Sequence, residues 1–278
     1  MKAQTRKELI SHLKILSSEE MSGRHPGTSG HKRAREYIVK QYEEIGLLPF
    51  TESFDQKFEL QSERERLTGH NLIGKIKGVS ERTIVISAHY DHLGKRNGKI
   101  YFGADDNASG VAALLHIAEY FKQHQPNHTL IFAAFDAEEL GLQGAKAFVS
   151  TLKPISVELN INMDMISHNN KNEIYVSGST HYPQLKSVIN KVDELNKTVS
   201  LKQGHDRKNT GSEDWTYQSD HGEFHQVGIP FAYFGVEDHV DYHKPSDTFD
   251  KIDTAFYCDV VKIILDFTKE IDLQTIEK

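Results

Sequence analysis

The sequence of 278 residues contains a single cysteine, Cys258, so it has no intramolecular disulfide framework. It also lacks any run of about 18 apolar residues, which is the length that a membrane-spanning helix needs, and we therefore expect no membrane span. There is no basic excess, because 33 Lys and Arg stand against 40 Asp and Glu and give a formal net charge of −7. This balance argues against a nucleic-acid partner, which would require a basic surface.

The first 20 residues alternate charged residues with Leu and Ile at helical spacing and contain no continuous apolar stretch. We therefore expect no signal peptide in this chain. The sequence shows no internal repeat and no low-complexity segment. We predict one domain over residues 1–278, in which helices within residues 1–48 pack on an α/β core.

Short apolar runs alternate with amphipathic segments through most of the chain. The predicted strands span residues 71–76, 83–88, 130–135, 159–163 and 230–234. The predicted helices span residues 8–16, 29–45, 110–121, 144–152, 182–194 and 255–270. This alternation predicts an α/β fold of three layers, in which helices cover both faces of a mostly parallel central sheet. Ligands of such sheets bind beyond the carboxyl ends of the strands.

Polar clusters follow these predicted strands, and each one alone has an ordinary structural explanation. The clusters are His89-Tyr90-Asp91-His92, residues 103–110 with Asp105 and Asp106, residues 136–141 with Glu138 and Glu139, Asp164, and residues 241–248 with Tyr242 and His243. Acidic residues before a helix often serve as N-caps, and glutamates are common on surfaces. Asp164 is the exception, because a carboxylate inside an apolar run is costly unless it is paired or binds a metal.

Together the clusters predict a metal site. Imidazole and carboxylate ligands suit zinc better than calcium, and the absence of thiolates argues against a structural zinc site. A catalytic zinc usually takes three protein ligands, so five candidates are too many for one ion. Two metal ions that share one carboxylate would use the whole set, which is His89, Asp106, Glu139, Asp164 and His243.

The motifs from His89 to residue 248, together with Met21-Ser22-Gly23-Arg24 near the amino terminus, resemble those of peptidase family M28. The family comprises zinc aminopeptidases with two metal ions, and its fold is of the zinc-exopeptidase (phosphorylase/hydrolase-like) type. The resemblance implies two Zn²⁺ ions per chain, with Asp106 as the bridging ligand. His89 and Asp164 would complete one site, whereas Glu139 and His243 would complete the other.

The resemblance also assigns roles to residues that are not metal ligands. Asp91 would orient His89, Glu138 would act as the general base, and Tyr242 would stabilise the tetrahedral intermediate. The peptide bond after Asp106 is expected to be cis, as it often is in the family. The implied activity is hydrolysis of the amino-terminal bond of peptides with a free N-terminus, in a protein that is exported. The chain has Gln218 where some secreted relatives carry an arginine, which leaves the substrate contacts of that arginine open.

Three alternatives remain. M20 peptidases and deacylases use a similar set of ligands, but they usually insert a lid domain between the last two ligands, whereas Asp164 and His243 lie only 79 positions apart in this chain. Glutaminyl cyclases share the fold but use one zinc, and His89 argues against that activity. A non-catalytic binding homologue would be expected to have lost ligands. The walls of the substrate pocket are expected in residues 204–213 and 236–241.

Overall fold

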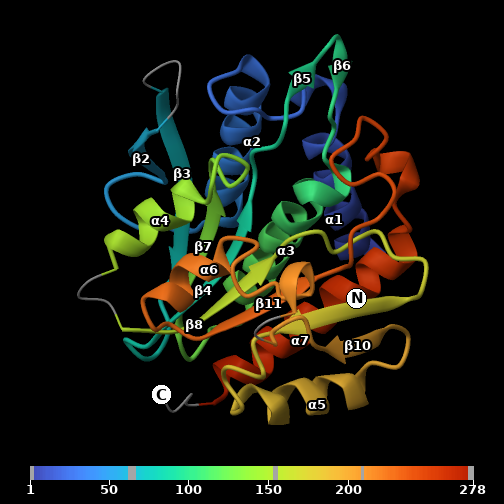
Figure 1. Cartoon of the computed structure of the whole chain (residues 1–278). Coiled ribbons are helices and arrows are strands. Elements are labelled where there is room, and N and C mark those ends of the chain that lie inside the picture. The colour runs from blue at the N-terminus through green and yellow to red at the C-terminus, as the bar shows by residue number, and fades with distance from the viewer. Residues whose placement is uncertain (1–2, 62–66, 153–155, 208–209, 275–278) are drawn as a thin grey trace.

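The computed structural model describes residues 3–61, 67–152, 156–207 and 210–274 (Figure 1). Its helices are α1 (Ala3–Leu16), α2 (Ser29–Ile45), α3 (Gly110–Gln123), α4 (Gln143–Ser150), α5 (Leu185–Leu195), α6 (His221–Gln226) and α7 (Thr254–Asp272). Its strands are β1 (Leu48–Pro49), β2 (Asp55–Leu60), β3 (Leu67–Ile76), β4 (Thr83–His89), β5 (Lys95–Arg96), β6 (Lys99–Ile100), β7 (Thr129–Phe135), β8 (Val157–Met163), β9 (Glu173–Ser177), β10 (Ser200–Gln203) and β11 (Phe231–Gly235).

Within the described residues, nine strands form one sheet in the order β1-β3-β7-β4-β8-β11-β9-β10, with β2 paired to β3. The four central strands, β7, β4, β8 and β11, are mutually parallel. Antiparallel pairing joins β3 to β7 on one side and β9 to β11 on the other. The predicted parallel sheet is therefore confirmed at the centre, and the carboxyl ends of its four central strands lie along one edge.

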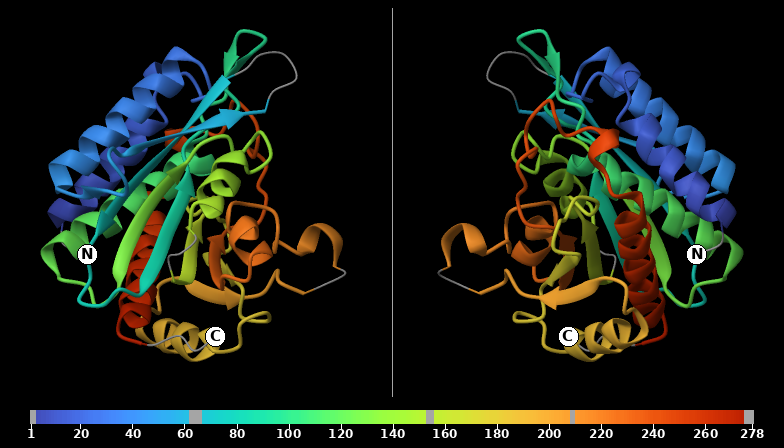
Figure 2. Two further views of the ribbon diagram at one scale, coloured as in Figure 1. Left: turned by 90° about the vertical axis from the view of Figure 1, so that its left-hand side faces the viewer. Right: turned by 90° about the vertical axis from the view of Figure 1, so that its right-hand side faces the viewer.

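The two faces of the sheet bury alternate side chains of the same strands, as the period of two requires. On β4, Ile84 and Ile86 belong to the larger apolar core, whereas Val85 belongs to a second core on the opposite face. The larger core includes side chains of α1, α2, α3, α5 and α7. The second core includes Phe148 of α4 and Phe224 of α6. Figure 2 shows these helices on the two sides of the sheet, which confirms the three predicted layers.

The predicted amino-terminal helix over residues 29–45 has these bounds in the structure. Thr28 caps its start by accepting a hydrogen bond from the His31 amide, and Gly46 ends it in the left-handed conformation with φ 80°. The neighbouring α1 packs against α3. No helix among the described residues is both long and apolar enough to cross a membrane.

Candidate active site

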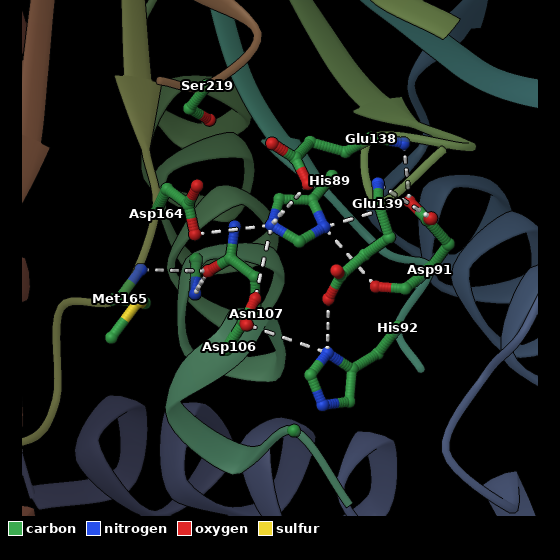
Figure 3. Close-up of polar contacts among 12 residues, drawn as sticks. His89, Asp91, His92, Asp106, Asn107, Glu138, Glu139, Asp164, Met165 and Ser219 are labelled. Atoms are coloured by element: carbon green, nitrogen blue, oxygen red, sulfur yellow. Dashed lines mark hydrogen bonds and ion pairs between the residues drawn. The ribbon is translucent and has the colours of Figure 1, made fainter. Parts of the chain in front are cut away.

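The predicted ligand residues come from the carboxyl ends of adjacent parallel strands. His89 is the last residue of β4, and its register partner on β7 is Phe135, after which the chain continues to Glu138 and Glu139. Asp164 directly follows β8 on the other side of β4. The parallel sheet therefore brings together side chains that lie up to 75 residues apart in the sequence (Figure 3).

One group of side chains gathers around His89, which is buried. Its Nε2 atom lies 3.2 Å from Oδ1 of Asp164, 3.4 Å from Oδ1 of Asp106 and 4.0 Å from Oε2 of Glu138. His89, Glu138 and Asp164 each offer a ligand atom within 4.8 Å of the others. The structure thus brings two of the predicted ligands, Asp106 and Asp164, and the predicted base around one imidazole nitrogen of His89.

A second group gathers around the other oxygen of Asp106. Its Oδ2 atom lies 3.1 Å from Nε2 of His243 and 3.6 Å from Nδ1 of His92. Glu139 contacts both imidazoles, with Oε2 at 3.3 Å from His243 and Oε1 at 2.6 Å from His92. Because the two oxygens of Asp106 face different histidines, this carboxylate lies between the two groups.

The side chain of Asp91 holds residues of both groups in place. Its buried carboxylate lies 3.7 Å from Nδ1 of His89 and accepts hydrogen bonds from the amides of Glu138 and Glu139, at 3.0 and 3.3 Å. The hydrogen-bond partner of His89 Nδ1 is the backbone carbonyl of Asp91, at 3.2 Å, and the two amide contacts of the carboxylate were not predicted. One carboxylate thereby fixes the turn that presents both glutamates.

The segment around Asp106 is held by buried polar contacts. The Asp106–Asn107 peptide bond is cis, as the family resemblance implied. The Asp247 carboxylate accepts hydrogen bonds from the amides of Asp105 and Asp106, while the Asp105 carboxylate accepts from the amide and hydroxyl of Ser167. Asp105 therefore serves this scaffold and points to partners other than the two groups.

Burial and neighbouring charges shift the ionisation of these side chains in opposite directions. Burial raises the pKa of Glu138 well above its ordinary value, against the opposing effect of His89. Burial also disfavours the ionised form of Asp106, but the imidazoles of His92 and His243 outweigh it and hold the pKa of Asp106 well below its usual range. Hydrogen bonds to Asp106 and Glu139 raise the pKa of His243 to about 10.

A pocket of about 310 Å³ opens onto both groups. Besides the ligand candidates and Glu138, the residues that line it are Gly141, Leu142, Met165, Tyr217, Gln218 and Tyr242. The predicted walls in residues 204–213 and 236–241 do not contribute to this lining, and residues 208–209 lie outside the described part of the chain. The prediction missed the turn before α4 and the segment before α6, which the tertiary fold brings to the pocket.

Gln218 occupies the position where some relatives have arginine, and its side chain is turned toward a neighbouring loop. Its Nε2 atom donates to the carbonyls of Ser212 at 2.9 Å and Asp214 at 3.3 Å. Tyr242 stacks its ring on that of His243, with 4.0 Å between the ring centroids. Both side chains thus border the pocket, each fixed by a neighbour.

Three residues near the site were not assigned a role from the sequence. His92 faces Glu139 as described above. The buried guanidinium of Arg24 donates to the carbonyls of Tyr90 and Gly103, which flank the two loops that carry His92 and Asp106. Asp220 is buried near Glu138, and burial raises its pKa well above the ordinary value, although His89 opposes this effect. The Met-Ser-Gly-Arg motif was the available signal for Arg24, and the only local signal for Asp220 is the polar sequence Ser219-Asp220-His221.

The chain is similar to known peptidases. The family model described as peptidase family M28 matches residues 71–268. The aminopeptidase YwaD of Bacillus subtilis is 33% identical over 199 residues, which is 66% of this chain and 41% of YwaD. A probable leucine aminopeptidase of Arthroderma otae is 29% identical over 213 residues, which is 70% of this chain and 56% of that protein. The chain thus spans about half the length of these relatives.

Solved structures share the fold at low sequence identity. A zinc aminopeptidase from Bacillus subtilis matches with a TM-score of 0.77 and 18% identity, over 96% of this chain and 95% of that one. A glutaminyl cyclase from Fimbriiglobus ruber matches with a TM-score of 0.79 and 21% identity, over 97% of this chain and 95% of that one. The fold alone does not separate these two activities. Since the family model covers most of the sequence, the chain belongs to peptidase family M28.

Proposed function

We propose that this chain is an aminopeptidase that hydrolyses the amino-terminal bond of peptides with a free N-terminus and uses two zinc ions. The observation that carries the proposal is the position of Asp106 between two groups of ligand side chains. Glu138 lines the same pocket as these side chains. The whole chain, residues 1–278, is proposed to act as one domain, with the helices of residues 1–48 packed on the core.

The side chains present fit two zinc ions. His89, Asp106 and Asp164 would hold one ion, and Asp106, Glu139 and His243 would hold the other. The donors are imidazole nitrogens and carboxylate oxygens without a thiolate, as in catalytic zinc sites. No Lys or Arg is among the described residues that line the pocket, so the side chains there that can balance its carboxylates are the histidines. Zinc, when bound, supplies a Lewis acid that acidifies water and polarises a carbonyl group.

Glu138 is proposed to take a proton from the attacking water and to return it to the leaving amine. A base works best when its pKa lies near the working pH. Burial moves the pKa of Glu138 in this direction, and its Oε2 atom faces the same imidazole nitrogen as Asp164 and Asp106. Asp91 holds the Glu138 amide in place and so sets where this carboxylate points.

Tyr242 is proposed to donate a hydrogen bond from its hydroxyl group to the oxyanion that forms on the substrate carbonyl. Its ring lines the pocket, and burial together with the charge of Asp106 raises its pKa, which keeps the hydroxyl protonated. The carboxylates that line the same pocket would attract the positively charged α-amine of a peptide. This attraction favours substrates whose N-terminus is free.

The test is hydrolysis of a panel of aminoacyl-nitroanilides, each with a free and an acetylated amine, before and after chelation. We expect turnover of the free-amine substrates only, loss of turnover after chelation, and recovery when zinc is added. Elemental analysis should find zinc in the active preparation. Equal cleavage of the acetylated substrates would contradict the exopeptidase assignment. Cyclisation of a glutaminyl peptide without hydrolysis of the panel would instead indicate a glutaminyl cyclase.

A further inference from the structure

A buried contact joins helix α2 to the loop that carries the two glutamates. The Nε2 atom of His31, near the start of α2, lies 2.8 Å from Oδ1 of Asp136, the residue that follows β7. Both side chains are buried, with 3% and 0% of their area exposed. The two residues lie 105 positions apart in the sequence. The contact therefore connects an amino-terminal helix to the loop that continues to Glu138.

The Asp136 carboxylate is surrounded by three hydrogen-bond donors. Its Oδ1 atom accepts from the Ala137 amide, and its Oδ2 atom accepts from the amide of His70 on β3, both at 2.8 Å. Because a carboxylate only accepts hydrogen bonds, Nε2 of His31 is the third donor. A buried carboxylate is costly without such donors, so together they hold Asp136 in one position. His31 supplies the donor that comes from a side chain.

The residue between Asp136 and Glu138 has a strained backbone. Ala137 has φ 57°, in the left-handed region that residues other than glycine rarely adopt. Such a conformation persists where the surrounding contacts determine it. Here the Ala137 amide donates to Asp136, and the next amide, that of Glu138, donates to Asp91. The direction in which Glu138 leaves the turn thus depends on where Asp136 is held.

The ring of His31 is itself fixed by the loop after β4. It stacks on the ring of Tyr90, with 4.9 Å between the centroids and 17° between the planes. Tyr90 is fully buried, and its hydroxyl donates to the His70 carbonyl at 2.8 Å. His70 thus contacts Tyr90 through its carbonyl and Asp136 through its amide. His31 contacts the same two side chains. Since Tyr90 directly follows His89, these contacts connect α2 to both loops.

We propose that His31 is a positioning residue for the general base, because it holds Asp136 and thereby sets the turn from which Glu138 reaches the pocket. This inference rests on the proposed role of Glu138. His31 is not among the described residues that line the pocket, so it acts through the turn. Its loss should lower kcat more than it changes KM, because the lining of the pocket remains while the base is displaced. A displacement of about 1 Å can cost about 100-fold in rate.

The test compares full-length wild type with three variants in kcat and KM on a free-amine aminoacyl-nitroanilide and in zinc content. His31→Phe keeps an aromatic ring on Tyr90 but removes the donor to Asp136, and His31→Gln restores a donor. The matched control is His12→Phe. His12 is also buried, and its Nδ1 atom lies 2.7 Å from the hydroxyl of Tyr37 on α2.

We expect the kcat of His31→Phe to fall about 10- to 100-fold, with KM and zinc content close to those of the wild type. His31→Gln should recover most of this loss. His12→Phe should keep the wild-type kcat, because it loses a buried contact between helices that does not reach the turn. Equal kcat values in His31→Phe and His12→Phe would overturn the proposal.

Amide hydrogen exchange of residues 136–142 follows the turn without depending on catalysis. Exchange in this segment should be faster in His31→Phe than in the wild type and His12→Phe, because the turn opens more often when Asp136 is released. Unchanged exchange would also overturn the proposal. Inactivity of the wild type on the substrate panel would instead contradict the proposed function. The exchange rates would then still decide whether His31 holds the turn.

Tyr90→Phe covers the case in which His31→Phe does not fold. This variant keeps the ring and removes only the hydroxyl that donates to the His70 carbonyl. The folded variant should show faster exchange in residues 136–142 and a lower kcat at the zinc content of the wild type. A wild-type value of either the exchange rate or kcat would overturn the proposal.

Discussion

His221 is an ionisable side chain that the fold keeps uncharged, and it gives the most quantitative prediction. The residue is fully buried at the start of α6, with its ring stacked on that of Tyr233 at 4.3 Å between centroids. Its Nε2 atom donates to the carbonyl of Trp215 at 2.8 Å. Burial lowers the pKa of His221 to about 3 from an ordinary value of 6.5.

The sign of the effect follows from the direction of this shift. A histidine whose pKa is lower in the folded state stabilises the fold fully above pH 6.5, and this stability is lost as the pH falls toward 3. The unfolded chain binds a proton at position 221 in this range and the folded chain does not. Lowering the pH from 7 to 5 should therefore remove about 2 kcal/mol of unfolding free energy through this one residue.

The assay is urea unfolding at pH 7 and pH 5, with chelator present so that metal binding does not change with pH. His221→Gln keeps a donor for the Trp215 carbonyl but cannot titrate. The wild type should lose about 2 kcal/mol more than this variant between the two pH values, while other titrating groups cancel in the comparison. His124→Gln, at an exposed position, reports the effect of removing a surface histidine. Equal losses in the wild type and His221→Gln would refute the argument.

Three further predictions concern buried contacts. His92→Phe removes the 2.6 Å contact with Glu139 and should weaken zinc binding about 10- to 100-fold in a chelator competition; unchanged affinity would contradict a role for His92. Asp91→Asn should lower kcat/KM by about 10- to 100-fold, because the carboxylate holds the turn of both glutamates; wild-type kinetics would exclude this role. Asp272→Asn should cost about 1–3 kcal/mol of unfolding free energy at pH 5.5, because Asp272 accepts a hydrogen bond from the His128 amide and raises the pKa of the His128 ring. The cost should shrink as the pH rises above neutrality and His128 loses its proton, and a cost that stays constant would contradict the ion pair.

The central strands were predictable because burial on both faces makes them almost continuously apolar. The predicted strand over residues 83–88 differs from β4 by one residue, since His89 still pairs with Phe135. Strand β9 and the edge strand β10 were not predicted. Only Leu201 is buried in β10, so its strand conformation depends on pairing with β9 rather than on its own pattern. The short helix α6 has too few residues to show a helical period.

The positions of the candidate ligands followed from strand ends, but the contacts around them did not. The contact of His92 with Glu139 joins residues 47 apart, and that of Asp247 with the Asp105 amide joins residues 142 apart. Nothing in the local sequence of either residue identifies its partner, because the partner is set by how the loops meet above the sheet. The predicted start of a helix at residue 182 was also early. The helix begins at Leu185, because Pro183 disfavours helical backbone at the residue before it.

The most direct test of the proposed mechanism is the turnover of Glu138→Gln measured together with its zinc content. Glutamine keeps the size of the side chain and cannot take a proton from water. Since the proposed zinc ligands remain, the variant should contain as much zinc as the wild type. Its kcat on a free-amine aminoacyl-nitroanilide should fall at least about 100-fold. A variant that holds the wild-type amount of zinc and retains most of its kcat would contradict the assignment of Glu138 as the base.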